Sequence, residues 1–326
     1  MQGKKYTVAG SGRWGSFLAW YCDKAGQRTT LLGRKGSENF AKLCDTRQNA
    51  YLQFPPSICL TDDDTALQDA DRVIISVGAQ NLRDYLTRER VAYLQNKPVI
   101  LCMKGLEENS GKRLTQVAIE QALQAENLAV WVGPGHIQEF LRGVPNCMLL
   151  DSMSPSLTRM LADELGAGCI RFYYGDDLIG TEVGAALKNV IGIAAGMLDG
   201  LGFTSLKGAL MARSVQEVGR LIRAMGGKER SAYGLAHLGD YEATLFSEHS
   251  HNRAFGMARV TGKPFDRLAE GYMTSAAAML LADRYGVDMP ISRCVYRILF
   301  CNADPMTELA ALFDRTRRTQ FDSLNE

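Results

Sequence analysis

The stretch Lys5-Tyr-Thr-Val-Ala-Gly10-Ser-Gly12-Arg-Trp-Gly15 is the most informative segment near the start of this 326-residue chain. A β-branched run, Tyr6–Ala9, leads into a G-x-G-x-x-G pattern that opens a helix-like run over Gly15–Ala25. The three glycines of such a pattern allow, in chain order, a tight turn, close approach of the backbone to a pyrophosphate, and close packing of helix on strand. The N–H groups at the helix N-terminus favour phosphate. We therefore predict a dinucleotide site made by Gly10, Ser11, Gly12, Arg13, Trp14 and Gly15.

The first half of the chain continues this alternation of strands and helices. Further candidate strands are Arg28–Leu32, Arg72–Val77, Pro98–Met103, Leu128–Val132, Cys147–Leu150 and Cys169–Tyr173. Several of these runs are mostly apolar without clean alternation, which is typical of strands covered by helices on both faces. Strands that alternate with helices predict a parallel sheet with right-handed crossovers.

The composition changes near Asp177. Beyond it, Ala, Leu, Met and Gly dominate long helical patterns such as Gly184–Leu198 and Leu206–Ala224, and good strand candidates are absent. The predicted fold class is therefore α/β, with a Rossmann-type, mostly parallel sheet domain over residues 1–177 and an all-helical substrate and catalytic domain over 178–326.

Charge, hydropathy and cysteine content limit the possible binding partners and the cellular location. A net charge of +1 gives no bulk attraction to nucleic acid or to an anionic membrane. We find no apolar run near the roughly 18 residues that a span requires, so stable membrane insertion is not expected. The start of the chain has no apolar segment of signal-peptide length, and the eight cysteines are scattered without a C-x-x-C pair. Together these features predict a cytoplasmic protein. The four histidines lack metal-ligand spacing, so no metal site is expected.

The end of the second predicted strand bears on the choice between NADP and NAD. An acid about 20 residues after the glycines binds the ribose 2′-OH in NAD sites, but this chain has Leu32-Gly-Arg34-Lys35 there. Two cations suit a 2′-phosphate, and a guanidinium can also stack on adenine. NADP is therefore favoured, while a solvated surface pair stays open as the alternative.

An unusual lysine lies in the small-residue run Gly180–Gly196. Lys188 interrupts an otherwise apolar helical pattern, and a buried ammonium without a partner is costly. A counter-charge must therefore come from elsewhere in the chain. Asp240, in Leu238-Gly-Asp240, is the candidate, and Thr244 and Asn252-Arg253-Ala-Phe-Gly256 follow it.

These residues carry a resemblance to the NAD(P)-dependent glycerol-3-phosphate dehydrogenases. The similar motifs occur in order along nearly the whole chain, at Gly10–Gly15, Lys104-Gly-Leu-Glu107, Leu187-Lys188-Asn189-Val-Ile, Gly239-Asp240, Asn252-Arg253-Ala-Phe-Gly256, Glu270-Gly271 and Val287-Asp-Met-Pro290-Ile. The resemblance implies an N-terminal dinucleotide-binding domain and an all-helical C-terminal domain. It also implies reduction of dihydroxyacetone phosphate to sn-glycerol 3-phosphate, which feeds glycerophospholipid synthesis, and hence a small phosphorylated substrate.

The resemblance also implies roles for individual residues. Lys188 matches the family's general acid, which stabilises charge on the carbonyl oxygen and delivers the proton. Asp240 would orient Lys188, and Lys104 would add a second cation near the carbonyl. Arg253 would hold the substrate phosphate with two parallel bonds, helped by Asn252. The last two assignments are a hydroxyl contact for Thr244 and the adenosine end of the cofactor for Glu270.

The chain departs from the family pattern at several positions. Gly135 stands where the family has a polar side chain, so His136, backbone or water would supply that contact, or the substrate differs. His237 precedes Leu238 where the family prefers other small or apolar residues. Two other functions therefore stay open: a related dehydrogenase of a different keto or hydroxy acid, and a non-catalytic NADP(H)-binding sensor. The apolar face Met273–Leu281 is either a homodimer interface or core.

Overall fold

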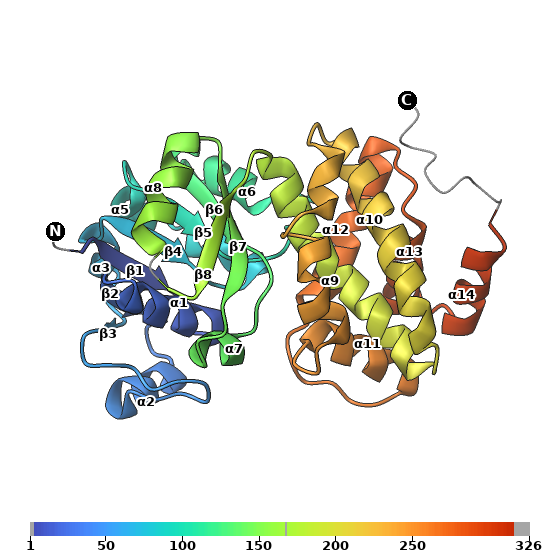
Figure 1. Ribbon diagram of the computed structural model, residues 1–326, viewed down its shortest axis with the longest axis horizontal. Helices are drawn as coiled ribbons and strands as arrows, with labels where there is room; N and C mark the ends of the chain where they lie inside the picture. The colour runs from blue at the N-terminus through green and yellow to red at the C-terminus, as the bar shows by residue number, and fades with distance from the viewer. Residues whose placement is uncertain (1–2, 167, 316–326) are drawn as a thin grey trace. The chain divides into compact units, whose positions relative to one another are not determined.

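A computed structural model of the protein describes residues 3–166 and 168–315. The chain forms two compact units (Figure 1). The first comprises Met1–Lys104 and Arg113–Leu178, and the second comprises Gly105–Lys112 and Ile179–Glu326. The chain therefore passes from one unit to the other more than once.

An eight-stranded sheet organises the described residues of the first unit, in the order β3-β2-β1-β4-β5-β6-β7-β8. The strands are β1 (Lys5–Ala9), β2 (Arg28–Leu32), β3 (Cys59–Thr61), β4 (Arg72–Ile75), β5 (Val99–Leu101), β6 (Leu128–Val132), β7 (Asn146–Ser152) and β8 (Ile170–Tyr174). Neighbouring strands are parallel except for β6 and β7. This arrangement confirms the predicted mostly parallel sheet. The strand order reverses between β1 and β4, the kind of position where ligands of open α/β sheets bind.

Helices connect these strands. They are α1 (Arg13–Lys24), α2 (Glu38–Thr46), α3 (Thr65–Gln68), α4 (Leu82–Tyr85), α5 (Arg88–Leu94), α6 (Leu114–Glu120), α7 (Ile137–Leu141) and α8 (Pro155–Leu165). Aromatic side chains fill much of the core beside α1. The rings of Phe17 and Phe140 stack at 5.1 Å, and Tyr21 meets Trp131 edge-on at 5.7 Å. These contacts fix the helix that follows the glycine turn.

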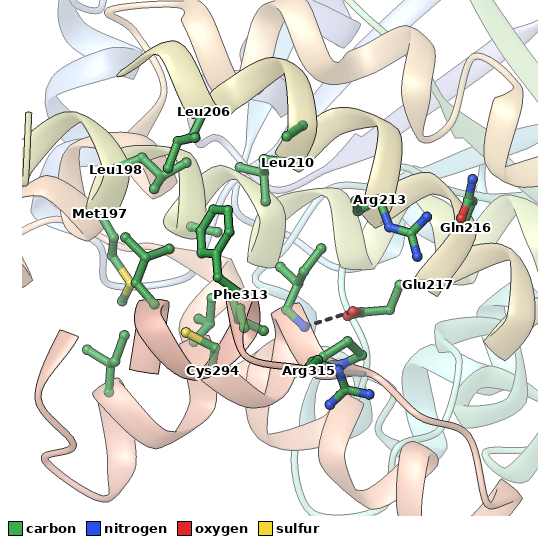
Figure 2. Close-up of a pocket in the computed structure, with 18 of the residues that line it drawn as sticks. Met197, Leu198, Leu206, Leu210, Arg213, Gln216, Glu217, Cys294, Phe313 and Arg315 are labelled. Carbon is green, nitrogen blue, oxygen red and sulfur yellow. Dashed lines mark hydrogen bonds between the residues drawn. The ribbon is translucent and has the colours of Figure 1, made fainter. Parts of the chain in front are cut away.

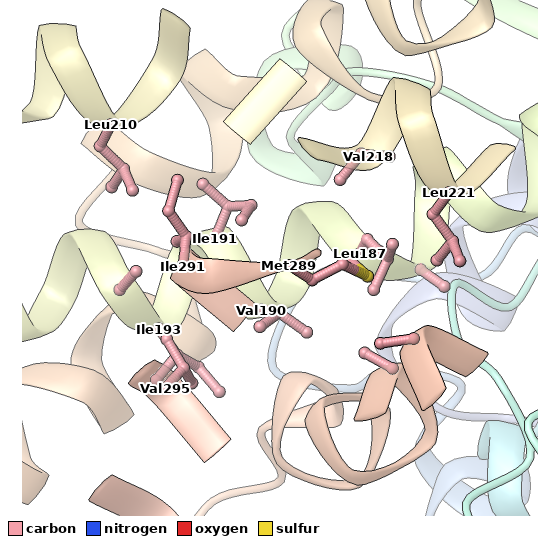
Figure 3. Packing of buried hydrophobic residues seen from close by; sticks show 14 of the residues in the cluster. Leu187, Val190, Ile191, Ile193, Leu210, Val218, Leu221, Met289, Ile291 and Val295 are labelled. Atoms are coloured by element: carbon pink, nitrogen blue, oxygen red, sulfur yellow. The ribbon is translucent and has the colours of Figure 1, made fainter. Parts of the chain in front are cut away.

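The described residues of the second unit contain helices and no strands. The elements are α9 (Leu178–Gly200), η3 (Thr204–Leu206), α10 (Lys207–Ala224), η4 (Glu229–Tyr233), η5 (Leu238–Asp240), a π-helical turn η6 (Glu242–Phe246), α11 (His251–Thr261), α12 (Glu270–Tyr285), α13 (Pro290–Phe300) and α14 (Pro305–Phe313). Figure 3 shows apolar side chains of α9, α10 and α13 meeting in the core. The helical prediction for this half is confirmed.

Helix α9 is the central element of the second unit. Its length and composition alone would let it cross a membrane, and 89% of the qualifying stretch is buried inside the protein. The sequence reading missed this run because Thr181, Glu182, Lys188 and Asn189 interrupt it. Near-complete burial is the pattern of a core helix.

The segment Gly105–Lys112 belongs to the helical unit although it lies far from it in sequence. Leu106 is fully buried in the helical core. Arg284 on α12 donates to the carbonyl oxygen of Ser110 at 2.9 Å. The sequence did not predict this insertion. A domain boundary near residue 177 stays a proposal, with 105–112 now assigned to the helical side.

The apolar face Met273–Leu281 of α12 lies mostly within the core. Ala277, Ala278 and Leu281 are buried, while Leu280 is 41% exposed. Most of this face is therefore used inside the unit.

Candidate functional site

The glycine turn after β1 has the geometry that a dinucleotide requires. Gly10 has a φ of +112°, and a Cβ there would lie 2.3 Å from the carbonyl oxygen of Ser76. A Cβ on Gly15 would lie 1.9 Å from the carbonyl oxygen of Gly10. At Gly12, the N-cap of α1, an added Cβ would meet no described atom within 4 Å. The backbone is therefore approachable where the second glycine was assigned to the pyrophosphate.

The remaining residues of the turn are anchored by neighbours. The guanidinium of Arg13 donates to Gln138 at 3.0 Å and lies 5.4 Å from the ring of Tyr51. The carbonyl oxygen of Ser11 accepts a bond from the Ser16 hydroxyl at 3.2 Å. Trp14 packs against Phe17, with ring centroids 5.1 Å apart. These contacts hold the turn in place without occupying the space beside Gly12.

Lys104 follows β5 and lies at the same edge of the sheet as the glycine turn. Its Nζ donates to the carbonyl oxygen of Gly133 at 2.7 Å and lies 6.0 Å from the ring centroid of Trp14. The structure thus brings together three sequence motifs that follow β1, β5 and β6. Such an edge is where ligands of doubly wound sheets bind.

Packing in the first unit explains why position 135 is a glycine rather than the polar residue that the family resemblance implies. This residue has a φ of +146°, and a Cβ there would lie 2.3 Å from a ring atom of Phe140. Phe140 is itself fixed by its stack on Phe17. A larger side chain at 135 would therefore have to displace a core aromatic ring. His136 follows as the N-cap residue of α7.

Arg34 and Lys35 are both exposed in the loop after β2. Lys35 lies near Asp63, which follows the neighbouring strand β3. Hydrogen bonds from Thr65 lower the pKa of Asp63, and the positive charge of Lys35 lowers it further. The strand β3, which the sequence did not reveal because Cys59-Leu-Thr61 is not an apolar run, thus places an acid beside one of the two cations.

The buried lysine of the helical unit lies in an ion pair. The Nζ of Lys188 on α9 is 2.8 Å from Oδ2 of Asp240 and 2.7 Å from Oγ1 of Thr244. The Thr244 hydroxyl donates to the backbone carbonyl of Asp240 at 2.7 Å. All three residues are at most 7% exposed. The structure thus brings together three residues that the sequence reasoning grouped.

A second charged cluster surrounds Arg253 on α11. Oδ2 of Asp199 accepts bonds of 2.6 Å from both Nε of Arg253 and Nζ of Lys207. Burial alone would raise the pKa of Asp199, but hydrogen bonds from Lys207 and Arg253 outweigh it and the pKa is lowered. Two cations share one carboxylate, which leaves one positive charge in excess within the cluster. A partly buried site of this kind suits an anion.

Sequence reasoning did not single out Asp199 and Lys207. They lie 54 and 46 positions before Arg253, and no motif joins them to it. The available signal was the same as for Lys188. Asp199 is an acid near the end of an apolar helical run, and such a charge requires a partner.

Asn252 links three helices. Its Nδ2 donates to Oδ1 of Asn189 on α9 at 3.0 Å, and its Oδ1 accepts from the backbone N–H of Gly271 on α12 at 2.9 Å. Glu270 precedes Gly271 as the first residue of α12 and is partly exposed. Asn252 therefore positions the start of α12, a use of its amide that the sequence did not predict.

Small residues on α9 let α11 approach it. A Cβ on Gly196 would lie 1.9 Å from the carbonyl oxygen of Arg253, and one on Gly192 would lie 2.7 Å from Cγ2 of Thr244. The Gly-x-x-x-Gly spacing places both glycines on the same side of the helix. The small-residue character of this segment therefore brings Arg253 and Thr244 close to the helix that carries Lys188.

A cavity of about 550 Å³ lies elsewhere in the helical unit, among α9, α10, α13 and α14 (Figure 2). Its wall is mainly apolar, and the residues predicted for catalysis or binding are not among those that line it. Glu217 at its edge accepts bonds from the backbone N–H groups of Ile291 and Ser292 at 2.8 and 2.9 Å. Burial raises the pKa of Glu217. This carboxylate caps the start of α13.

Comparison with known proteins identifies the family. Residues 5–157 match the NAD-dependent glycerol-3-phosphate dehydrogenase N-terminus, and residues 177–310 match the C-terminus of the same family. Glycerol-3-phosphate dehydrogenase [NAD(P)+] of Desulfitobacterium hafniense is 35% identical, with 98% of this chain and 94% of the relative covered. The Pseudoalteromonas translucida protein of the same name is also 35% identical, over 96% and 98% of the two chains.

A solved structure agrees with these relatives. The crystal structure of glycerol-3-phosphate dehydrogenase from Coxiella burnetii superimposes with a TM-score of 0.88 at 27% identity, covering 97% of this chain and 100% of that one. Both halves of the family pattern and the complete fold are thus present. The chain belongs to the NAD-dependent glycerol-3-phosphate dehydrogenase family.

Proposed function

We propose that this protein reduces the C2 carbonyl of dihydroxyacetone phosphate with NADPH or NADH, and so forms sn-glycerol 3-phosphate. The observation that carries the proposal is the buried Lys188 ammonium held between Asp240 and Thr244. The relatives named glycerol-3-phosphate dehydrogenase [NAD(P)+] supply the substrate class. The product is a precursor for glycerophospholipid synthesis.

The roles of the charged residues follow from the charge that develops during reduction. A bound nicotinamide would supply the hydride that the carbonyl carbon accepts. The carbonyl oxygen then gains negative charge, which the Lys188 ammonium stabilises while it delivers a proton. Asp240 orients the ammonium and balances its charge. Lys104 retains the role of a second substrate cation that the family resemblance implies.

The Asp199 cluster supports an anion site for the substrate phosphate. Arg253 uses Nε to bind Asp199, while the guanidinium carries further N–H donors for two parallel bonds. Lys207 adds a second positive charge within the same cluster. In this proposal Asn252 positions the start of α12 through its bond to Gly271, and Thr244 orients the ammonium of Lys188.

For the cofactor, the turn Gly10–Gly15 with its open space at Gly12 supports a pyrophosphate site. We assign Arg34 and Lys35 to a 2′-phosphate, which favours NADP, although Asp63 beside Lys35 weakens this preference. Glu270 stays assigned to the adenosine end by resemblance. A cytoplasmic location and a homodimer are further predictions, the latter checked by light scattering on the purified protein.

The test is oxidation of NADPH and of NADH by the purified protein with dihydroxyacetone phosphate, followed by nicotinamide absorbance. Lys188→Ala should lower kcat by roughly 10²- to 10⁴-fold while NADPH binding stays unchanged, because the general acid is removed and the cofactor contacts are not. A related dehydrogenase would instead turn over other keto acids. A sensor would bind NADPH but show no turnover even in the wild type, so Lys188→Ala would have no rate to lower.

A further inference from the structure

A buried polar chain that the proposed reaction does not use lies beside Lys188. Nδ1 of His237 is 2.9 Å from the carbonyl oxygen of Gly184, and its Nε2 is 2.6 Å from the hydroxyl of Tyr241. That hydroxyl is in turn 2.7 Å from Oγ of Ser214. His237, Tyr241 and Ser214 are all fully buried. Such a chain is costly unless every member is paired, so its presence calls for a reason.

The contacts fix the protonation state of the imidazole. A carbonyl oxygen only accepts, so Nδ1 of His237 must carry the proton and donate to Gly184. Nε2 is then the acceptor for the hydroxyl of Tyr241. Burial lowers the pKa of His237 to about 4, and the positive charge of Lys188 contributes in the same direction. The imidazole is therefore neutral at physiological pH and places no second positive charge beside the ammonium.

The contact between His237 and Gly184 joins the two segments that carry the ion pair of Lys188 and Asp240. In an α-helix the carbonyl of residue 184 accepts the backbone N–H of residue 188, so His237 binds α9 one turn before Lys188. On the other side, His237 lies three residues before Asp240, and its own carbonyl oxygen accepts the backbone N–H of Asp240 at 3.0 Å. Gly184 leaves room for this contact, because a Cβ there would lie 3.1 Å from Cβ of His237.

We propose that His237 is a positioning residue, which ties α9 to the turn before Asp240 and so sets the geometry of the Lys188–Asp240 pair. The inference rests on the proposed function, in which Lys188 is the general acid. The contact depends on the imidazole at position 237, which binds both Gly184 and Tyr241. A small residue there would leave the carbonyl of Gly184 without this donor and the hydroxyl of Tyr241 without this acceptor.

The test compares two substitutions of similar size with different polarity. His237→Asn keeps an amide N–H near the position of Nδ1, whereas His237→Leu fills the space without a donor. Each variant is measured for kcat, for KM with dihydroxyacetone phosphate, for NADPH affinity and for thermal midpoint. The assays are run well below the midpoints, so that loss of fold is not mistaken for loss of rate.

If His237 positions the pair, His237→Leu lowers kcat by roughly 10- to 100-fold with NADPH affinity unchanged, since small misplacements of catalytic groups are costly. His237→Asn then recovers most of that loss. The inference is overturned if His237→Leu keeps kcat within about twofold of the wild type, or if both variants lose kcat equally. Absence of turnover in the wild type would instead overturn the proposed function.

Discussion

Two lysines buried in the helical unit each lie beside a counter-charge. Lys188 pairs with Asp240, and Lys207 pairs with Asp199, at distances of 2.8 and 2.6 Å. Removing one partner of such a pair leaves an uncompensated buried charge, which is more damaging than the pair is stabilising. These residues therefore constrain one another, and substitutions at any of them act through its partner.

His237 makes the native state sensitive to acid. Burial lowers its pKa from 6.5 to about 4, so between these values the unfolded chain binds a proton that the folded protein does not. Its contribution to stability is complete at pH 7 and is lost as the pH falls from about 6.5 towards 4. By linkage the loss is about 3 kcal/mol.

Urea unfolding of the wild type and of His237→Leu at pH 7 and pH 4.5 checks this prediction. The fall in the free energy of unfolding between the two pH values should be smaller in the variant. Asp240 and other carboxylates titrate in both proteins, so the difference between the two falls isolates His237. An equal fall in both proteins would contradict the assignment.

At the scale of elements, helix α9 depends on its glycines. Gly196→Ala would place a methyl group 1.9 Å from the carbonyl oxygen of Arg253, so α11 must move away. We expect a loss of at least about 2 kcal/mol in the free energy of unfolding, together with weaker substrate binding, because Arg253 moves with its helix.

Gly208 on α10 provides the matched control. A Cβ there would meet no described atom within 4 Å, so Gly208→Ala should be neutral or stabilise by about 0.4–1 kcal/mol. Thermal unfolding and KM for dihydroxyacetone phosphate, measured on both variants, check the pair. Equal effects at the two positions would show that close approach of α11 is not what Gly196 provides.

Elements were more predictable than contacts. Short apolar or β-branched runs revealed seven of the strands, whereas β3, Cys59-Leu-Thr61, has no such run to detect. Lys188 and Asp240 were paired in advance because a charge in an apolar helix must find a partner. The ion pair of Asp199 with Arg253 was not predicted, because no sequence motif relates the two residues. The lack of room for a Cβ at Gly135, beside Phe140, was not predicted either, because side-chain packing is determined by the three-dimensional fold.

At the scale of the whole molecule, cofactor binding should appear as added stability. A ligand at 100 times its Kd stabilises the folded form by about 2.7 kcal/mol. NADPH should therefore raise the temperature of the unfolding transition of the unit that contains Gly10–Gly15. If Arg34 and Lys35 bind a 2′-phosphate, NADH at the same concentration raises it less.

Scanning calorimetry with each cofactor measures both shifts, and Arg34→Ala is the control for the second. The variant should reduce the shift with NADPH and leave the shift with NADH nearly unchanged. A larger shift with NADH in the wild type would reverse the cofactor preference.

The placement of residues 105–112 has a consequence for inheritance. The chain changes unit at three peptide links, after Lys104, after Lys112 and after Leu178. A recombination event with one crossover near residue 178 would combine helices of the second unit from one parent with the segment Gly105–Lys112, which contains the buried Leu106, from the other. Such a chimaera has a mismatched core from the outset. The two halves of this protein are therefore expected to have diverged as one gene, rather than to have been shuffled as interchangeable modules.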